Sequence, residues 1–242
     1  ITVMGARTWG DGYIQGTSFE GYNYFANISK RINENHQLSL TGFGAPQQHY
    51  QRSGGLTMAE WNNVRKYMKD GMHFSRFNPT YGYDDYGNQN SANYNVYHKP
   101  QISLNHIWQI DHKSSLSTTA YVSLGRGYGR TAEPGYNSSY SYTDLTYGSN
   151  YGTLAHTFRR EDGTFDYGAV EFANSPNNPI YDPNSDQYEK LYAGSQLVIC
   201  ENRNDHNWYG LTSTYTNKFA DIFDFYAGID VRYYQGKHNA TI

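Results

Sequence analysis

Tyrosine is the side chain whose number and grouping in this sequence point most directly to chemistry, because 26 of the 242 residues are tyrosines. A tyrosine ring has a flat apolar face and a hydroxyl, so it stacks on a ligand while hydrogen bonds fix the ligand's orientation. On exposed loops, such groups suit the capture of a large polar ligand such as a metal chelate, a corrinoid or a glycan. The candidate ligand-binding residues are Tyr81, Tyr83, Asp84, Asp85, Tyr86, Tyr136, Tyr140, Tyr142 and Tyr147.

The same tyrosines have a second interpretation, in which tyrosine and glycine let long loops pack on one another without a conventional core. No other group competes with them as a reactive site. The nine histidines are scattered, and neither a His-Glu-x-x-His zinc motif nor a Gly-x-Ser-x-Gly nucleophile turn is present. The acidic stretch 182–189 lacks the glycine and the final acidic residue of a calcium loop, so we interpret it as a polar turn. The sequence predicts no catalytic residue, no metal site and no cofactor.

The elements that hold these loops are strands with two different faces. From Phe223 to Tyr233 every second residue is apolar or aromatic, and the residues between them are mainly polar or glycine. A period of two this regular predicts an extended strand between an apolar and a polar medium. The segment from Trp208 to Phe219 repeats the pattern and pairs with it as a hairpin. The candidate residues of the polar side, which either line a ligand path or pair with one another, are Lys218, Asp224, Asp230 and Arg232.

The composition indicates what these two media are. The chain is 17% aromatic but only 37% hydrophobic, and its mean hydropathy is −0.83. A water-soluble sandwich of this length normally contains more Val, Ile and Leu for a dry core. An outer-membrane barrel has a polar lumen, a thin lipid-facing band and aromatic residues at both interfaces, so its average is hydrophilic. The net charge of −3 argues against a strongly basic nucleic-acid binder.

The order of strands and loops is asymmetric. We expect a short strand or loop at 1–6, long strands at 13–32, 37–45, 95–111 and 116–124, and the terminal hairpin, with tight turns at 33–36, 111–114 and 220–222. Between the hairpins lie excursions of about 50 and 80 residues, whereas connections usually have about 4–6. The first contains a predicted helix that starts at a capping box, Thr57–Glu60, and ends at Gly71; the second contains two predicted short strands, 164–172 and 191–199. Short turns at one end and long loops at the other are typical of an outer-membrane barrel.

Three strings of residues resemble one protein family. They are DGYIQGTSFEGYNYF at 11–25, FGAPQQHYQR at 43–52 and YHKPQISLNH at 97–106. They are similar to TonB-dependent outer-membrane receptors of the Bacteroidetes type, over most of residues 11–130 and in the layout of the remainder. The resemblance implies a barrel of about 22 strands around an N-terminal plug, opened by an energising inner-membrane complex. It also implies that this chain is the middle part of the barrel, without the plug and the remaining strands.

The sequence therefore predicts an all-β fold, an antiparallel transmembrane β-barrel segment of about six long strands in three hairpins, with long extracellular loops and one short helix. Residues 1–242 are expected to form one partial outer-membrane β-barrel domain. The expected function is an active transporter or receptor for a scarce nutrient (an iron chelate, a corrinoid or a glycan) in the outer membrane of a Gram-negative bacterium. We do not expect an enzyme.

The expected partners follow from the resemblance. They are the TonB complex, reached through the missing N-terminal part, a small or medium polar ligand, the lipid bilayer and, as an optional addition, a surface lipoprotein; nucleic acid is not expected. Two alternatives stay open at this point. One is a passive porin or adhesin barrel without energy coupling, and the other is a soluble, tyrosine-rich, glycan-binding β-protein.

Overall fold

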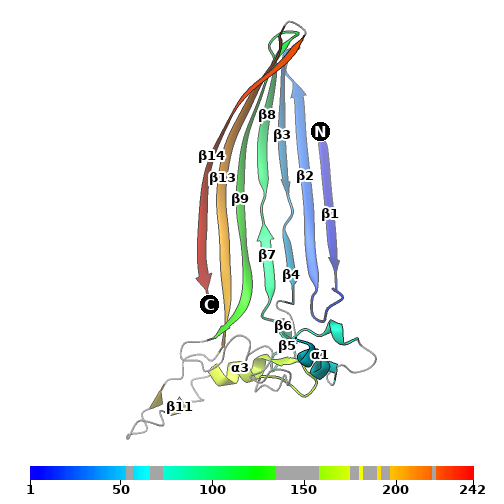
Figure 1. Cartoon of the computed structure of the whole chain (residues 1–242), viewed down its shortest axis with the longest axis vertical. Coiled ribbons are helices and arrows are strands. Elements are labelled where there is room, and N and C mark those ends of the chain that lie inside the picture. The colour runs from blue at the N-terminus through cyan, green and yellow to red at the C-terminus, as the bar shows by residue number, and fades with distance from the viewer. Residues whose placement is uncertain are drawn as a thin grey trace.

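The computed structural model describes residues 1–52, 57–65, 73–134, 158–174, 180–181, 190–191, 197–219 and 222–242. Within these ranges the chain is an all-β protein dominated by one large antiparallel sheet. Figure 1 shows the sheet as one tall layer, with the helices and the small strands gathered at its lower end. None of the helices in these ranges is long and apolar enough to cross a membrane.

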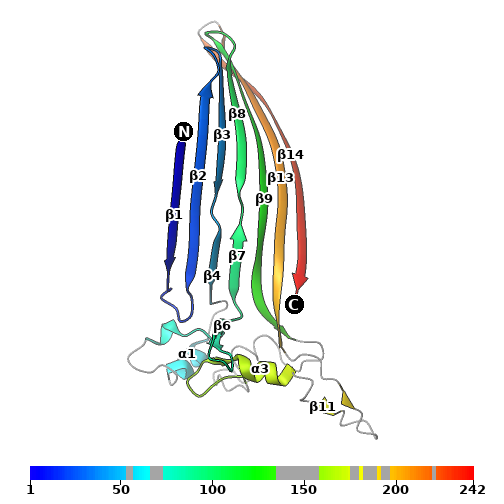
Figure 2. The same ribbon diagram turned by 180° about the vertical axis from the view of Figure 1, so that it is seen from behind.

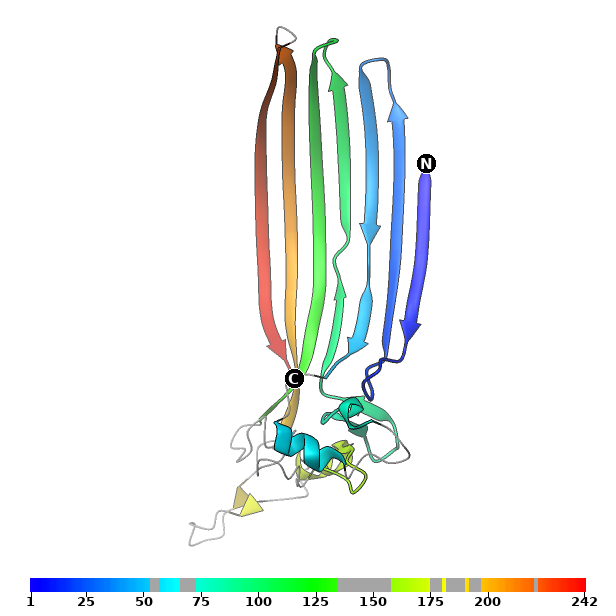
Figure 3. The ribbon, with the colours of Figure 1, turned by 45° about the vertical axis from the view of Figure 1, so that its right-hand side comes forward.

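Nine strands form the large sheet, and their order across it follows the chain from β1 at one edge to β14 at the other. β4 continues the line of β3, and β7 runs on into β8, so the nine strands make seven ribbons lying side by side (Figures 2 and 3). Their bounds are β1 Thr2–Gly10, β2 Phe19–Arg31, β3 His36–Gly44, β4 Gln47–Tyr50, β7 Tyr94–His98, β8 Gln101–Gln109, β9 Ser114–Pro134, β13 Leu197–Phe219 and β14 Phe223–Thr241.

The pairing register is unbroken across the two places where a ribbon changes strand. β2 keeps one register with β3 and β4, and β9 keeps one register with β8 and β7. Pro46 and Pro100 lie at the two breaks, and a proline has no N–H to donate to the ladder. The pairing continues past Pro46, whose carbonyl accepts the Tyr22 N–H at 2.9 Å. The prolines therefore interrupt hydrogen bonding locally without moving any side chain to the other face.

Because the register is continuous, each row of paired residues stays on one face of the sheet. We call the face that carries Leu104 the apolar face and the face that carries Asn105 the polar face. One row of the apolar face is Ile28, Leu40, Leu104, Ala120, Leu211 and Val231. The adjacent row, on the polar face, is Ser29, Ser39, Asn105, Thr119, Thr212 and Asp230. The alternation predicted from the sequence therefore continues across these six ribbons in the middle of the sheet.

The side chains of the polar face bond to one another across strands. The Asn27 amide donates to the hydroxyls of Ser39 and Thr41, both at 2.8 Å. The Thr119 hydroxyl donates to the Asn105 amide oxygen, also at 2.8 Å. Cross-strand pairs of this kind are the unit of stabilisation of a sheet.

The turns between β2 and β3 and between β8 and β9 lie at one end of the sheet, at the top of Figure 1. Residues 220 and 221 of the turn predicted at 220–222 lie outside the described residues. The Asn33 side chain accepts the N–H groups of Asn35 and His36, both at 2.9 Å. The Asp111 carboxylate accepts the N–H groups of Lys113 and Ser114 at 2.7 and 2.8 Å. Both are turns fixed by an Asx side chain, which confirms the predicted turns at 33–36 and 111–114.

The long connections gather at the opposite end. We call residues 57–65, 73–93 and 158–174 the loop cap. Its elements are α1 Met58–Val64, η2 Phe74–Arg76, β5 Tyr81–Tyr83, β6 Gln89–Ser91, β10 Phe165–Asp166 and α3 Tyr167–Asn174. β5 pairs with β6 and, in parallel, with β10. A separate antiparallel pair consists of β11 Ile180–Tyr181 and β12 Lys190–Leu191.

The loop cap has a small buried core that joins the two long connections. Ala92 comes from the first connection, and Phe158, Phe165 and Tyr167 come from the second; all four are almost fully buried. The Tyr167 hydroxyl donates to the Thr80 carbonyl at 2.5 Å and accepts the Ala92 N–H at 2.6 Å. The cap is therefore held by phenylalanine packing and polar bonds.

Several predicted strand bounds were wrong. β1 is a full strand of the sheet, whereas a short strand or loop was expected. The strand predicted from Tyr13 begins only at Phe19, because the Gly12 N–H donates to the Thr17 carbonyl at 3.0 Å and Gly16, with φ of +66°, completes a turn there. β9 extends ten residues past the predicted end at 124, and β13 starts at Leu197 and not at 208.

The second long connection differs most from the prediction. The strand predicted at 164–172 is wrong, since only Phe165–Asp166 is extended and α3 follows at once. The Asp166 carboxylate accepts the Ala169 N–H at 3.1 Å and caps that helix. Of the strand predicted at 191–199, the described parts belong to β12 and to the start of β13. The predicted helix is confirmed at Met58–Val64, and its expected end at Gly71 lies outside the described residues.

Candidate functional site

Aromatic and charged side chains gather on the polar face where β9, β13 and β14 run together. Two registers bring them together: Tyr121 and Arg232 both lie opposite Gly210, and Trp208 lies opposite Tyr234. We call this group the polar-face cluster. Its members are Tyr121, His206, Trp208, Asp230, Arg232 and Tyr234.

Trp208 is at the centre of the polar-face cluster. Its ring meets the rings of Tyr121 and Tyr234 edge to face, with centroids 6.1 and 6.3 Å apart. The Arg232 guanidinium lies 5.9 Å from the Trp208 ring, and its Nε donates to Asp230 Oδ1 at 2.9 Å. The Arg232 and Asp230 side chains are 56% and 42% exposed, so the ion pair adds little stability. Its donors and acceptors remain accessible to a ligand.

Two glycines make room for the rings of this cluster. A Cβ added at Gly210 would lie 2.2 Å from the Tyr121 ring, and one at Gly125 would lie 2.2 Å from the His206 ring. Each glycine is the direct register partner of the aromatic residue that covers it. A side chain at either position would lift the ring off the sheet, so the glycines position the aromatic surface.

The predicted polar-side residues all lie on the polar face, in two separate places. Asp230 and Arg232 belong to the polar-face cluster. Lys218 and Asp224 are paired in register next to the turn between β13 and β14, and the six residues from Asp224 to Asp230 span about 20 Å along the strand. The sequence reasoning missed Tyr121, His206, Trp208 and Tyr234. Aromatic residues at polar-face positions were the signal that could have found them.

The predicted ligand-binding group at 81–86 lies in the loop cap. The hydroxyls of Tyr81 and Tyr83 are 2.6 Å apart, and their rings meet edge to face at 5.5 Å. Partial burial, together with this hydrogen bond, raises the pKa of Tyr81 well above its usual value, so its hydroxyl stays neutral. Tyr86 is 85% exposed. Of the three tyrosines, Tyr86 is the one presented to solvent.

The two carboxylates of this group have structural partners. Asp84 accepts the side-chain amide of Asn88 at 2.8 Å and the backbone N–H groups of Asn88 and Tyr86 at 2.8 and 2.9 Å. These bonds, that of the Asn88 side chain first, lower the pKa of Asp84. Asp85 lies against Gly168 in the first turn of α3, where an added Cβ would collide with its carboxylate. Both contacts indicate that the carboxylates shape the loop cap.

The second predicted tyrosine group, Tyr136, Tyr140, Tyr142 and Tyr147, lies outside the described residues, and so does the polar turn at 182–189. Within the part of the chain that the structure describes, no three His, Cys, Asp or Glu side chains come together as a metal site. The polar-face cluster combines stacking surfaces with hydrogen-bond donors and acceptors. This arrangement suits the binding of a polar ligand.

Comparison with known proteins finds no relative of this chain. The chain matches no protein-family model, and no curated protein is similar to it. The resemblance to TonB-dependent receptors therefore stays a prediction from the residues.

Proposed function

We propose that the chain is part of the wall of an outer-membrane β-barrel transporter, which captures a scarce nutrient at its loop cap and admits it along the polar face. The observation that carries this proposal is the pair of adjacent rows defined above. One row is apolar and the next is polar, without exception, across six ribbons of the sheet. Lipid on one side and a water-filled lumen on the other account for both rows at once.

The exposure of the apolar face argues against a water-soluble role. Ile28, Leu40, Leu104, Leu211 and Val231 are each 40% to 60% exposed, although they form one continuous row. Soluble monomers rarely expose a contiguous apolar patch of more than a few hundred Å². Covering this face with acyl chains recovers roughly 25 cal/mol for each Å² of apolar surface removed from water. The lipid bilayer is therefore a partner in the proposal.

The edges of the sheet fit a barrel with further strands. Among the described residues β1 and β14 are the two edges and do not pair with each other, so the sheet is open. An unpaired edge promotes aggregation, and barrels remove it by closure. Closure takes about eight strands at least, which exceeds the seven ribbons seen here. In the proposal, other strands of the full-length protein pair with β1 and β14.

The layout of the loop cap and the polar-face cluster supports transport. The cap lies at the long-loop end, where outer-membrane barrels meet their ligands. The cluster lies within the sheet, on β9, β13 and β14. The substrate class in this proposal is an iron chelate, a corrinoid or a glycan. Coupling to the TonB complex through a plug comes from the resemblance in residues 11–25, 43–52 and 97–106.

Fractionation of cells that make the full-length protein tests the proposal. We expect the protein in the outer membrane, and recovery in a soluble fraction would refute the barrel. Growth of a deletion strain on single iron, cobalamin or glycan sources then identifies the substrate. Uptake that stops when the proton-motive force is collapsed distinguishes the energised transporter from a passive porin, which would continue to admit its solute.

A further inference from the structure

On the apolar face, the residue type changes abruptly toward the loop cap. The apolar-face positions of β9 from Leu116 to Leu124 are apolar except for a threonine, and the following three are Arg126, Tyr128 and Arg130. Neighbouring ribbons change at the same level, since Arg7, His98 and Arg203 lie on this face there. The change therefore forms a basic and aromatic border along one side of the apolar face.

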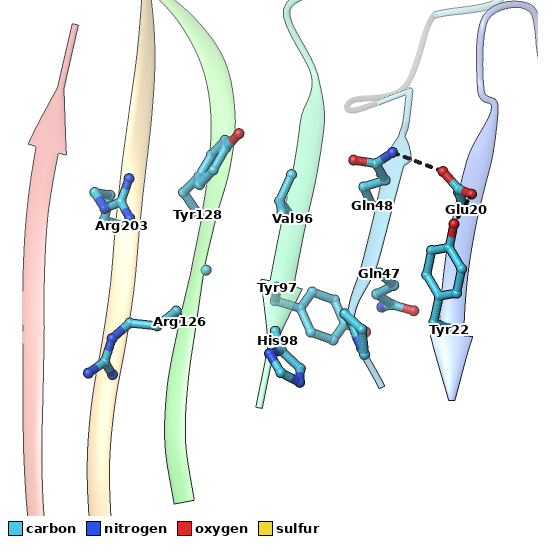
Figure 4. Close-up of a pocket in the computed structure, with 12 residues that line it drawn as sticks. Glu20, Tyr22, Gln47, Gln48, Val96, Tyr97, His98, Arg126, Tyr128 and Arg203 are labelled. Carbon is cyan, nitrogen blue, oxygen red and sulfur yellow. Dashed lines mark hydrogen bonds between the residues drawn. The ribbon is translucent and has the colours of Figure 1, made fainter. Parts of the chain in front are cut away.

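A groove of about 350 Å³ lies in this border. Pro46 and Val96 are the apolar residues that line it. In Figure 4, Arg126, Arg203 and Tyr128 stand on one side of Val96, and Glu20 and Tyr22 stand on the other. The groove thus combines apolar surface with guanidinium groups at one end.

The cationic end of the groove is incompletely neutralised. Arg126 donates to three neutral oxygens, the carbonyls of Gly125 and His206 and the side chain of Asn207, at 2.7, 3.0 and 3.1 Å. No carboxylate in the described ranges forms an ion pair with it. Arg203 shares the carboxylate of Glu201, at 3.7 Å, with Arg130, which lies at 3.4 Å. The Asp205 carboxylate lies beside Arg126 and accepts the Gly127 N–H at 3.2 Å. It forms no ion pair with Arg126 in the described ranges, so the guanidinium groups of Arg126 and Arg203 keep donors for an added anion.

The carboxylate at the other end of the groove is already occupied. Glu20 accepts the Arg7 guanidinium at 2.8 Å and the Tyr22 hydroxyl at 2.5 Å. These bonds hold its charge at the far side from Arg126 and Arg203. An anion at the cationic end therefore meets little repulsion from it.

The level of the groove matches that of lipid headgroups. Six residues separate Ala120, in the middle of the apolar positions of β9, from Arg126. They span about 20 Å along the strand, or roughly 15 Å along the membrane normal at a strand tilt of about 40°. The hydrocarbon core of a bilayer is about 30 Å thick, so its half-thickness is about the same. In the barrel, Arg126 lies where acyl chains end and phosphates begin.

We propose that this groove binds the phosphate-bearing headgroup of a lipid in the leaflet on the loop side, with Arg126 and Arg203 holding the phosphate. Guanidinium groups match phosphate oxygens in geometry and charge. Tyr22 and Tyr128 fit the same depth, because tyrosine places its ring among acyl carbons and its hydroxyl among headgroups. This inference rests on the proposed membrane location.

The test compares two lipids that differ only in the phosphate. The full-length protein is placed in phosphatidylcholine nanodiscs doped with phosphatidic acid or with diacylglycerol of the same chains, and retained lipid is counted by native mass spectrometry. We expect phosphatidic acid to be retained about 25-fold more, since each of the two arginines near a membrane surface strengthens binding about fivefold. The double variant Arg126→Gln with Arg203→Gln should lose most of that preference. Lys30→Gln, on the same face at the turn side, should keep it.

Each outcome decides the inference. Equal retention of the two lipids by the unaltered protein overturns it, whatever the variants do. Displacement of phosphatidic acid by millimolar inorganic phosphate would mean a free-phosphate site and would also overturn it. If fractionation places the protein in the outer membrane while the lipids are not distinguished, the headgroup site fails and the barrel stands. A soluble protein would refute both.

Discussion

A single charge placed on either face of β13 tests the assignment of the two media. Leu211 lies in the apolar row, between Ala120 and Val231, and the next residue, Thr212, lies in the polar row between Thr119 and Asp230. The variants Leu211→Arg and Thr212→Arg therefore introduce the same side chain at neighbouring positions of one strand. The two variants differ only in the face of the sheet on which the guanidinium lies.

The expected costs differ by more than the experimental error. An arginine at the lipid-facing middle of a barrel strand costs about 2–4 kcal/mol, which corresponds to roughly a 30-fold to 1,000-fold loss in the folding equilibrium. On the polar face the change stays within about 0.5 kcal/mol. The attraction to Asp230 on the adjacent strand offsets part of any loss at Thr212.

Reversible unfolding of the full-length protein from phospholipid vesicles, in a denaturant series, measures both costs. We predict that Leu211→Arg lowers the free energy of unfolding by at least about 2 kcal/mol more than Thr212→Arg. Equal effects, or a larger effect at Thr212, would refute the assignment of lipid to the apolar face. In a soluble protein both sites would be surface positions, and neither change would cost more than about 0.5 kcal/mol.

Three further predictions concern the sites. Gly210→Ala should displace the Tyr121 ring and change the fluorescence of the tryptophan beside it, because the added Cβ would lie 2.2 Å from that ring. Tyr167→Phe should destabilise the loop cap by about 1–3 kcal/mol in local hydrogen exchange, since it leaves the buried Ala92 N–H without its acceptor. The backbone amides of Tyr86 and Asn88 donate to Asp84, and their hydrogen-exchange protection factors should stay constant down to about pH 4 and fall below it. The folded pKa of Asp84 is lower than its ordinary value of 3.8, so the stabilising charge is lost only as the pH falls through that lower folded pKa.

Each of these predictions has a matched control. Gly129→Ala should leave fluorescence unchanged, because no atom lies within 4 Å of the added Cβ. Tyr86→Phe removes a hydroxyl from an exposed tyrosine of the same cap and should not alter exchange. Asp84→Asn should abolish the acid transition at the turn. Persistence of the transition in that variant would assign it to another group.

The fold was predictable where one physical signal dominates. Alternation from Phe223 to Tyr233 predicts a strand and its faces, because only an extended chain places every second residue on one side. Asn33 and Asp111 mark the tight turns, because their side chains accept the N–H groups that follow. β1 was underestimated because its nine residues alternate poorly, and it owes its structure to pairing with β2.

The site was less predictable than the fold, because it depends on partners distant in sequence. Tyr121 meets Trp208 only through the pairing of β9 with β13 across the second long connection. The local sequence predicts a strand at 164–172, because nothing local reveals that Asp166 acts as a helix cap. The structural use of Asp84 was foreseeable in type, since Asp commonly fixes turns, but its partner Asn88 was not.

The central claim is that lipid contacts one face of β14 and water contacts the other. Spin labels placed one at a time from Phe225 to Arg232, in a full-length protein whose Cys200 is replaced by Ser, report this directly through their collision rates with oxygen and with a water-soluble nickel complex. The account predicts strict alternation, with oxygen contact at Phe225, Ala227, Ile229 and Val231 and nickel contact at the residues between them. Equal access to nickel at all positions would contradict it.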